Sequence, residues 1–173
     1  MSKDGDAGVT YVLCGQKFSK SDNIIHFVGT VDELNSHLGL LKAWLCHAAA
    51  LSNEDAPQST CQFIEAIQKK LMKLMSHASD VKNDKYFFSK DDVSDLEKEI
   101  ERLTEKLPKI AGFVLPGKNI TEAQIQIART VARRAERLFF AIGRRQLCPE
   151  AGAYLNRLSG YLFLLSQYTD MYA

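Results

Sequence analysis

The segment from residue 128 to residue 137 gathers the side chains most able to do chemistry in this chain. It reads Ala-Arg-Thr-Val-Ala-Arg-Arg-Ala-Glu-Arg, with four arginines and one glutamate. At about 100° per residue, one stripe of such a helix carries Arg129, Arg133, Glu136 and Arg137. Guanidinium groups in a row can each grip phosphate oxygens bidentately, which is typical of a polyphosphate site. A solvated charged face with internal Glu–Arg pairs is the alternative interpretation.

The composition is that of one ordinary globular domain. The chain has 173 residues, 46% of them hydrophobic and 25% charged, and a net charge of +1. The near-neutral charge disfavours a general binder of nucleic acid or of charged membrane surfaces. No apolar run reaches the roughly 18 residues that a membrane-spanning helix needs, and the first ten residues lack the apolar core of a signal peptide.

The cysteines and histidines form no recognisable metal motif. The four cysteines are Cys14, Cys46, Cys61 and Cys148. They are far apart and show no C-x-x-C spacing, so we expect reduced thiols in an intracellular protein, not a zinc site or a disulfide framework. The four histidines show neither E-x-x-H nor H-E-x-x-H spacing, which argues against a di-iron bundle and a zinc protease.

Helical periodicity begins after residue 24. The apolar stripe of the first helix covers residues 31–45, and Thr30 and Glu33 are spaced as a capping box at its start. A break at 53–57 separates it from a second helix, whose stripe covers residues 64–78.

The middle of the chain predicts a loop, a helix and a connection. Residues 82–90 are polar and are expected to form the loop. The third helix has its apolar stripe over residues 93–107, and Pro108 ends it. Residues 109–119 then form a connection that contains glycine and proline.

Two further helices complete the expected fold. The fourth runs from about Thr121 to about Arg145, and the fifth begins near Pro149 with an apolar stripe over 155–165. The predicted core face of the fourth helix is Ile127, Val131, Ala135, Leu138 and Ile142. Apolar residues flank that stripe and are expected to face another subunit: Ala128, Ala132 and Phe139. Since no strand alternation persists, the prediction is an all-α antiparallel five-helix bundle over residues 24–173.

Residues 1–23 form a separate N-terminal segment. The stretch from Asp4 to Thr10 is polar and punctuated by glycine, and Gly15, Lys17 and Lys20 follow it. Glycines let the backbone approach a ligand closely, and successive amide groups can form an anion-binding nest. A polar chain end without a ligand is the alternative.

Four segments together carry a resemblance to a known family. They are Lys-Asp-Gly-Asp-Ala-Gly-Val-Thr at 3–10 with Ser19-Lys20, Gly-Thr-Val-Asp-Glu-Leu-Asn-Ser at 29–36, Gly-Phe-Val-Leu-Pro-Gly at 112–117, and Tyr-Leu-Asn-Arg-Leu-Ser at 154–159. In their order and spacing the chain resembles the ATP:cobalamin adenosyltransferases of the propanediol-utilisation type. That family consists of trimeric five-helix bundles in which Co(I) of reduced cobalamin attacks the 5′ carbon of ATP and releases triphosphate.

The resemblance implies an ATP site shared between the N-terminal segment of one subunit and the arginine helix of its neighbour. The implied ATP-binding residues are Ser2, Lys3, Asp4, Gly5, Asp6, Gly8, Thr10, Tyr11, Lys20, Arg133, Arg134, Glu136, Arg137 and Asn156. Mg²⁺ is expected to bridge the phosphates with few or no protein ligands.

Three residues are implied to act in catalysis. Asp32 and Arg129 look like a salt bridge between subunits, and Phe113 looks like the residue beneath the corrin that excludes the lower axial ligand of cobalt. Each has a structural alternative. Asp32 lies in a first helical turn, where the macrodipole stabilises an acid, and Phe113 could anchor a loop to the core.

The resemblance also implies partners and a compartment. We expect a homotrimer, with a cobalamin reductase and an adenosylcobalamin-dependent mutase or dehydratase as partners and no nucleic acid or membrane. The expected location is the cytoplasm of a prokaryote or the mitochondrial matrix of a eukaryote. One alternative is a non-catalytic trimer that binds ATP or cobalamin, because Asp4 and Lys118 stand where the family usually has Thr and Gly. The other is a helical scaffold whose arginine face meets acidic partners or RNA.

Overall fold

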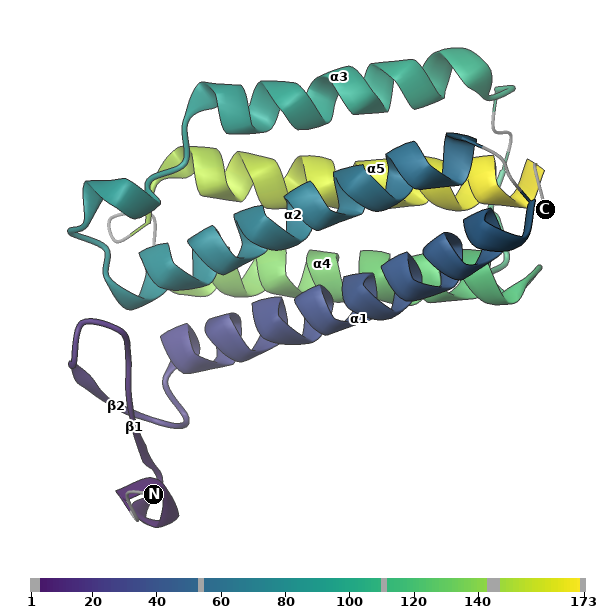
Figure 1. Cartoon of the computed structure of the whole chain (residues 1–173). Helices are drawn as coiled ribbons and strands as arrows, with labels where there is room; N and C mark the ends of the chain where they lie inside the picture. Colours follow the sequence, from purple (N-terminus) through teal and green to yellow (C-terminus); the bar gives the residue numbers. More distant parts are fainter. Residues whose placement is uncertain (1–3, 53–54, 110–111, 143–146, 172–173) are drawn as a thin grey trace.

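Five long helices make up most of the part of the chain that the structure describes, as predicted (Figure 1). The structure is a computed structural model that describes residues 4–52, 55–109, 112–142 and 147–171. The helices are α1 (Asn23–Ser52), α2 (Asp55–Ser79), α3 (Lys90–Lys106), α4 (Ile120–Ile142) and α5 (Pro149–Met171). The helix α1 packs on α2 and α4, and α5 packs on α3 and α4. Within the described ranges, no helix combines the length and the apolarity that crossing a bilayer would require.

The core lies where the apolar stripes of the helices meet. The predicted stripes of the first two helices are buried from Val31 to Leu45 and from Ile64 to Ala78. Where α4 and α5 pack together, a Cβ atom at Gly152 would lie 2.6 Å from the ring of Phe139. The close approach of α4 and α5 therefore depends on the absence of a side chain at residue 152.

The first helix begins about two turns earlier than predicted. It starts at Asn23, and its first amide groups, those of Ile25 and His26, donate to the carbonyl of Asp22. Thr30 is a buried residue inside the helix, so the capping box predicted there is wrong. The helix extends because Phe27, which is fully buried, continues the apolar period toward the N-terminus.

The buried stripe of α4 agrees with the prediction only in part, because Val131 and Ala135 are buried as predicted and Ile127 is not. Ile127 is 46% exposed, whereas Ala128 and Ala132 are fully buried and Phe139 is 3% exposed. The real stripe advances by three and four residues through Ile125, Ala128, Ala132, Ala135 and Phe139. The residues expected to face another subunit thus fill the core of this chain, and that expectation was wrong. The predicted helix end near Arg145 lies outside the described residues.

A short hairpin precedes the bundle, and the sequence did not predict it. The strands β1 (Val9–Tyr11) and β2 (Lys17–Ser19) pair antiparallel, with Thr10 opposite Phe18, after a 3₁₀ turn η1 (Asp4–Ala7). Strands of three residues are too short for an alternating pattern to be recognised. The hairpin projects from the end of the bundle at which α1 begins (Figure 1).

One buried carboxylate joins α2 to the start of α3. A second 3₁₀ turn, η2 (Asp84–Tyr86), lies in the loop before α3. The side chain of Asp92 is 6% exposed and accepts hydrogen bonds from the backbone of Ser89 (2.8 Å), from Lys73 (3.0 Å) and from Lys70. The backbone amide of Asp92 in turn donates to the side-chain oxygen of Ser89, which completes a capping box. Burial alone would raise the pKa of Asp92, but the hydrogen bonds from Lys70, Ser89 and Lys73 outweigh it and lower the pKa to about 2.

The stability of the protein should therefore fall in acid through Asp92. Because its folded pKa is depressed, its contribution is present above about pH 4 and is lost as the pH falls toward 2. Asp92→Asn should lower the free energy of unfolding at pH 7 by about 2 kcal/mol and flatten its dependence on pH in that window. Urea denaturation at several pH values measures both. Asp91→Asn is the matched control, since its exposed neighbouring carboxylate should contribute much less. Equal losses in the two variants would refute the role of Asp92.

Candidate active site

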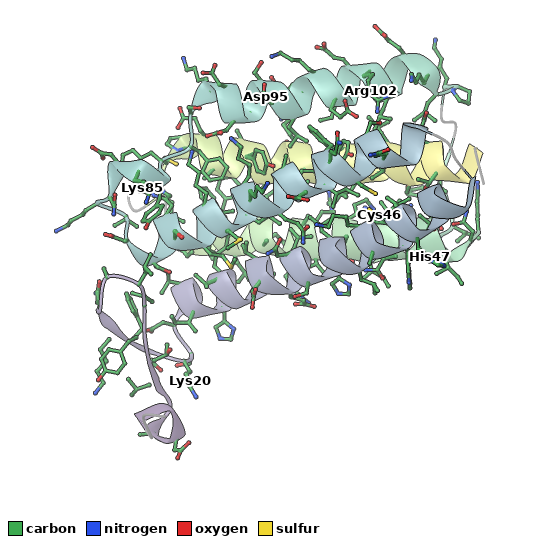
Figure 2. The ribbon with its side chains drawn as sticks, viewed as in Figure 1. Lys20, Cys46, His47, Lys85, Asp95 and Arg102 are labelled. Atoms are coloured by element: carbon green, nitrogen blue, oxygen red, sulfur yellow. The ribbon has the colours of Figure 1, made fainter. Side chains whose placement is uncertain are left out.

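The N-terminal segment is held in a closed loop by Lys20 (Figure 2). Its Nζ donates to the carbonyl of Gly5 at 2.7 Å, and its backbone amide donates to the carbonyl of Gly8 at 2.8 Å. Gly8 has φ +74°, a conformation that favours glycine. The lysine predicted to bind phosphate and two of the glycines predicted to cradle it therefore lie together in one chain.

A cavity of about 510 Å³ lies between this loop, α1 and α4. Lys20 lines it from the end of the hairpin, His26 and Glu33 from α1, and Arg134 and Leu138 from α4. A salt bridge joins Arg134 to Glu33 across the cavity, and both side chains are nearly half exposed. Glu33 was not among the predicted site residues, although it belongs to the Gly-Thr-Val-Asp-Glu motif. The arrangement is a solvent-accessible site where two cations and one anion face a space that can admit a polar ligand.

Two further predicted residues meet at a second cavity, of about 400 Å³, between α4 and α5. Asn156 donates through Nδ2 to Oε1 of Glu136 at 2.8 Å, and Arg157 donates to Oδ1 of Asn156, also at 2.8 Å. Arg157 in turn bonds to Glu97 of α3 at 2.9 Å. The amide of Asn156 is thus oriented by neighbours on both of its atoms, which a fixed hydrogen-bonding position requires.

The arginines of α4 have different surroundings. Arg129 is half-buried, and its Nε donates to Gln126 at 2.6 Å. Burial lowers the pKa of Arg129, the charge of Arg133 lowers it further, and Glu122 opposes both effects. Arg133 and Arg137 are exposed. A row of arginines that repel one another and face solvent is poised to receive an anion.

The predicted pair of Asp32 and Arg129 does not form within one chain. Asp32 is exposed on α1, and among the residues that the structure describes it makes no ion pair. Arg129 uses Gln126 instead, and Gln126 donates to Ser166 of α5 at 3.0 Å.

Phe113 is fully exposed, and its neighbour in the loop, Leu115, is 82% exposed. The interpretation of Phe113 as an anchor of its loop to the core is therefore wrong for this chain. The loop is fixed from its other end by Glu122, whose carboxylate is fully buried. Glu122 accepts hydrogen bonds from the amides of Gly117 (2.7 Å) and Lys118 (3.3 Å), and Gly117 has φ +104°.

Glu122 is a residue that the sequence analysis did not recognise as part of the site. Its own backbone amide donates to Oδ1 of Asn119 at 2.8 Å. Asn119 and Glu122 therefore have the spacing of a capping box and one of its two hydrogen bonds. That spacing was the signal that could have identified it. The carboxylate reaches past the helix end into the loop, so it holds the segment that carries Phe113 relative to α4.

The remaining predicted site residues belong to the N-terminal segment. Ser2 and Lys3 lie outside the described residues, and Asp4 is described only as the start of η1. Asp6 is exposed, Thr10 is half-buried within β1, and Tyr11 is 55% exposed.

No cluster of metal-binding side chains accompanies these residues. Across the described part of the chain, no group of three or more His, Cys, Asp or Glu side chains could hold a metal ion.

Known proteins match the chain over nearly its whole length. The family model of cobalamin adenosyltransferase matches residues 1–169. A corrinoid adenosyltransferase of Citrobacter freundii is 37% identical, with 96% of this chain and 92% of the relative covered. A cobalamin adenosyltransferase of Cupriavidus metallidurans is 36% identical, with coverages of 96% and 85%. The structure of a variant PduO-type ATP:corrinoid adenosyltransferase from Lactobacillus reuteri, complexed with cobalamin and ATP, superposes with a TM-score of 0.84 at 28% identity, covering 99% of this chain and 93% of that one.

Proposed function

This chain belongs to the cobalamin adenosyltransferase family, and we propose from that membership how its own residues perform the reaction. The chain is an ATP:corrinoid adenosyltransferase. It transfers the 5′-deoxyadenosyl group of ATP to the cobalt of reduced cobalamin and releases triphosphate. A cobalt–carbon bond forms as the bond from C5′ to the triphosphate oxygen breaks. Cobalt supplies the nucleophile, so the reaction needs no nucleophilic side chain.

We propose that the triphosphate lies in the cavity lined by Lys20 and Arg134. The observation that carries this assignment is the convergence of those two cations, one from the hairpin and one from α4, on one accessible space. Negative charge grows on the triphosphate as it leaves, so cations fixed beside it stabilise the transition state more than the ground state. The salt bridge from Glu33 to Arg134 holds the guanidinium in place before ATP arrives.

Arg133 and Arg137 extend the same positive surface, and we propose that they bind phosphate oxygens of an ATP held by a neighbouring subunit. Both are exposed in the single chain, so neither is committed to a partner in the core. Glu136 and Asn156, bonded to each other at 2.8 Å, offer fixed polar positions for the nucleoside part of that ATP. A Mg²⁺ ion would be held mainly by the phosphates.

We propose a homotrimer with active sites between subunits. The side-chain amide of Gln124 on α4 donates to the backbone carbonyl of His37 on α1 at 3.0 Å, so the stripes of residues that contain them lie side by side. These stripes carry exposed apolar residues on one α1/α4 face, hereafter the apolar face: Leu40, Trp44, Ile120 and Ile127. A second copy on this face would bury them. It would also let Asp32 of one subunit meet Arg129 of the next.

Distances along α4 support a shared site. Helix α4 (Ile120–Ile142) follows the Phe113 loop in the chain, and its Arg134 lines the cavity with Lys20. At 1.5 Å per residue, Ile120 and Arg134 are about 20 Å apart along the helix. The phosphate loop and Phe113 of one chain therefore lie near opposite ends of the bundle. In this arrangement the N-terminal segment, residues 1–23, binds phosphate. The five-helix domain, residues 24–173, is the platform that positions it.

We propose that Phe113 lies beneath the corrin and keeps the lower ligand from cobalt. Its full exposure means that one face of the ring is available to a flat apolar ligand. Removing the lower ligand makes Co(II) easier to reduce to the Co(I) nucleophile. A reductase must supply that electron, and an adenosylcobalamin-dependent mutase or dehydratase uses the product. We expect the protein in the cytoplasm of a prokaryote or in the mitochondrial matrix of a eukaryote.

The direct test of the function is the absorption spectrum of the protein with pre-formed Co(I) cobalamin and MgATP. Adenosylcobalamin should accumulate with the wild-type chain. Arg133→Ala should raise the KM for ATP roughly thirtyfold or more, since losing a charge-assisted contact costs about 2–5 kcal/mol. Arg102→Ala, on α3 and paired with Glu99, is the control and should leave KM unchanged. Binding of both substrates without product would favour the non-catalytic alternative.

The oligomeric state tests the shared site. Light scattering at micromolar concentration should give the mass of a trimer. Ile127→Glu should shift that mass toward the monomer, because burying an unpaired carboxylate in an apolar interface costs several kcal/mol. Met72→Glu is the control, as Met72 is 58% exposed on α2, away from the apolar face. A monomeric wild-type chain would remove both the shared site and the pairing of Asp32 with Arg129.

Phe113→Ala separates generation of the nucleophile from transfer. The melting temperature should change little, because the ring makes no core contact in this chain. Turnover from Co(II) with a reductant should collapse, whereas turnover from pre-formed Co(I) should survive better. The spectrum of the Co(II) complex with ATP reports the four-coordinate form directly. If the four-coordinate population were the same in Phe113→Ala and wild type, Phe113 would have no role in excluding the ligand.

A further inference from the structure

Two cysteines from neighbouring helices lie in direct contact. Cys46 is on α1 and Cys61 is on α2, and their Sγ atoms are 2.7 Å apart. Figure 2 labels Cys46 on the part of α1 that lies beside α2. The sulfur atoms of a disulfide are about 2.05 Å apart, so the two thiols need move by less than about 1 Å to form one. The spacing of 15 residues in the sequence gave no sign of this contact.

The two thiols differ in access. Cys46 is exposed, whereas Cys61 is 6% exposed and directs its S–H toward the carbonyl of Lys42 at 3.8 Å. Burial, and then the neighbouring Cys46, raise the pKa of Cys61 to about 12. A small oxidant can therefore reach Cys46 first, while Cys61 is held behind it.

We propose that Cys46 and Cys61 form a reversible thiol-oxidation site whose co-substrate is a low-molecular-weight disulfide such as glutathione disulfide. The thiolate of Cys46 attacks one sulfur of that disulfide and releases one glutathione thiolate, leaving a mixed disulfide on Cys46. The sulfur of Cys61 then attacks the sulfur of Cys46, its proton passing to the second departing glutathione. The protein loses two protons and two electrons, and the oxidant takes up both to become two molecules of glutathione.

The bond would link the end of α1 to the start of α2. It would close a loop over residues 47–60, which restricts the unfolded chain and stabilises the folded one. Residue 46 is about 30 Å along α1 from His26 at the proposed phosphate cavity. The expected consequence is therefore a higher melting temperature, independent of the transferase activity.

The other two cysteines provide controls within the chain. Cys14 is exposed at the hairpin turn, and Cys148 is near His77, whose Nε2 accepts from the Cys148 amide at 3.1 Å. Neither has a second sulfur in contact within the described residues. Cys14 should stop at the mixed disulfide with glutathione, because no resolving thiol is at hand.

The experiment treats the full chain with mixtures of glutathione and glutathione disulfide, traps free thiols by alkylation, and maps the peptides by mass spectrometry. Trypsin leaves both cysteines in the peptide 43–69, so a second cleavage after Glu54 is needed to separate them. We expect a Cys46–Cys61 cross-link in the wild type and a melting temperature several degrees higher. Both should reverse with dithiothreitol.

Single variants distinguish the two roles. Cys61→Ser should leave Cys46 as a lasting glutathione adduct, Cys46→Ser should leave Cys61 free, and Cys14→Ser should not change the cross-link. A glutathione adduct that persists on Cys46 of the wild type would overturn the proposal. So would a cross-link that joins either cysteine to Cys14 or Cys148 as often as to its neighbour.

Discussion

The whole structure depends on the close packing of α4 between α1 and α5. Small residues make this possible, since Ala128, Ala132 and Ala135 are fully buried and Gly152 leaves room for Phe139. An alanine stripe lets helix axes approach closely while adding little apolar area of its own. With one side of α4 occupied in this way, its arginines must point outward. The packing that stabilises the bundle therefore also creates the positive surface.

Periodicity predicted the helices because each buries one continuous stripe. It predicted α2, α3 and α5 well, where leucine and isoleucine mark the buried face. On α4 it placed Val131 and Ala135 correctly but failed at Ile127, which is more hydrophobic than alanine and yet lies outside the core. Hydrophobicity ranks residues by transfer free energy, whereas a crowded helix crossing selects for size. The hairpin escaped prediction because its pairing, with Thr10 opposite Phe18, depends on contacts between residues eight apart, not on a local pattern.

The candidate site could be predicted as a set of residues but not as a geometry. The motifs marked Lys20 and Arg134, yet only the structure shows that they line one cavity and that Glu33 already pairs with the arginine. Glu122 was missed for a related reason. A glutamate in a first helical turn is stabilised in any protein, and its bonds to Gly117 and Lys118 appear only when the loop is placed.

The exposure of several site residues is itself informative about how the enzyme works. Phe113 is fully exposed, and Asp32 makes no ion pair within the described residues. In the proposed trimer, Phe113 would contact the corrin and Asp32 would contact Arg129 of the next subunit. The exposed arginines of α4 would likewise gain a partner on binding, in this case through their charge. Burial, and then the charge of Arg133, lower the pKa of Arg129, so these two neighbouring guanidinium groups repel each other. A bound polyanion would relieve that repulsion, and its departure as triphosphate would restore it. The charge that helps the leaving group form would thus also hold it after transfer, so triphosphate release is a candidate for the slow step of turnover.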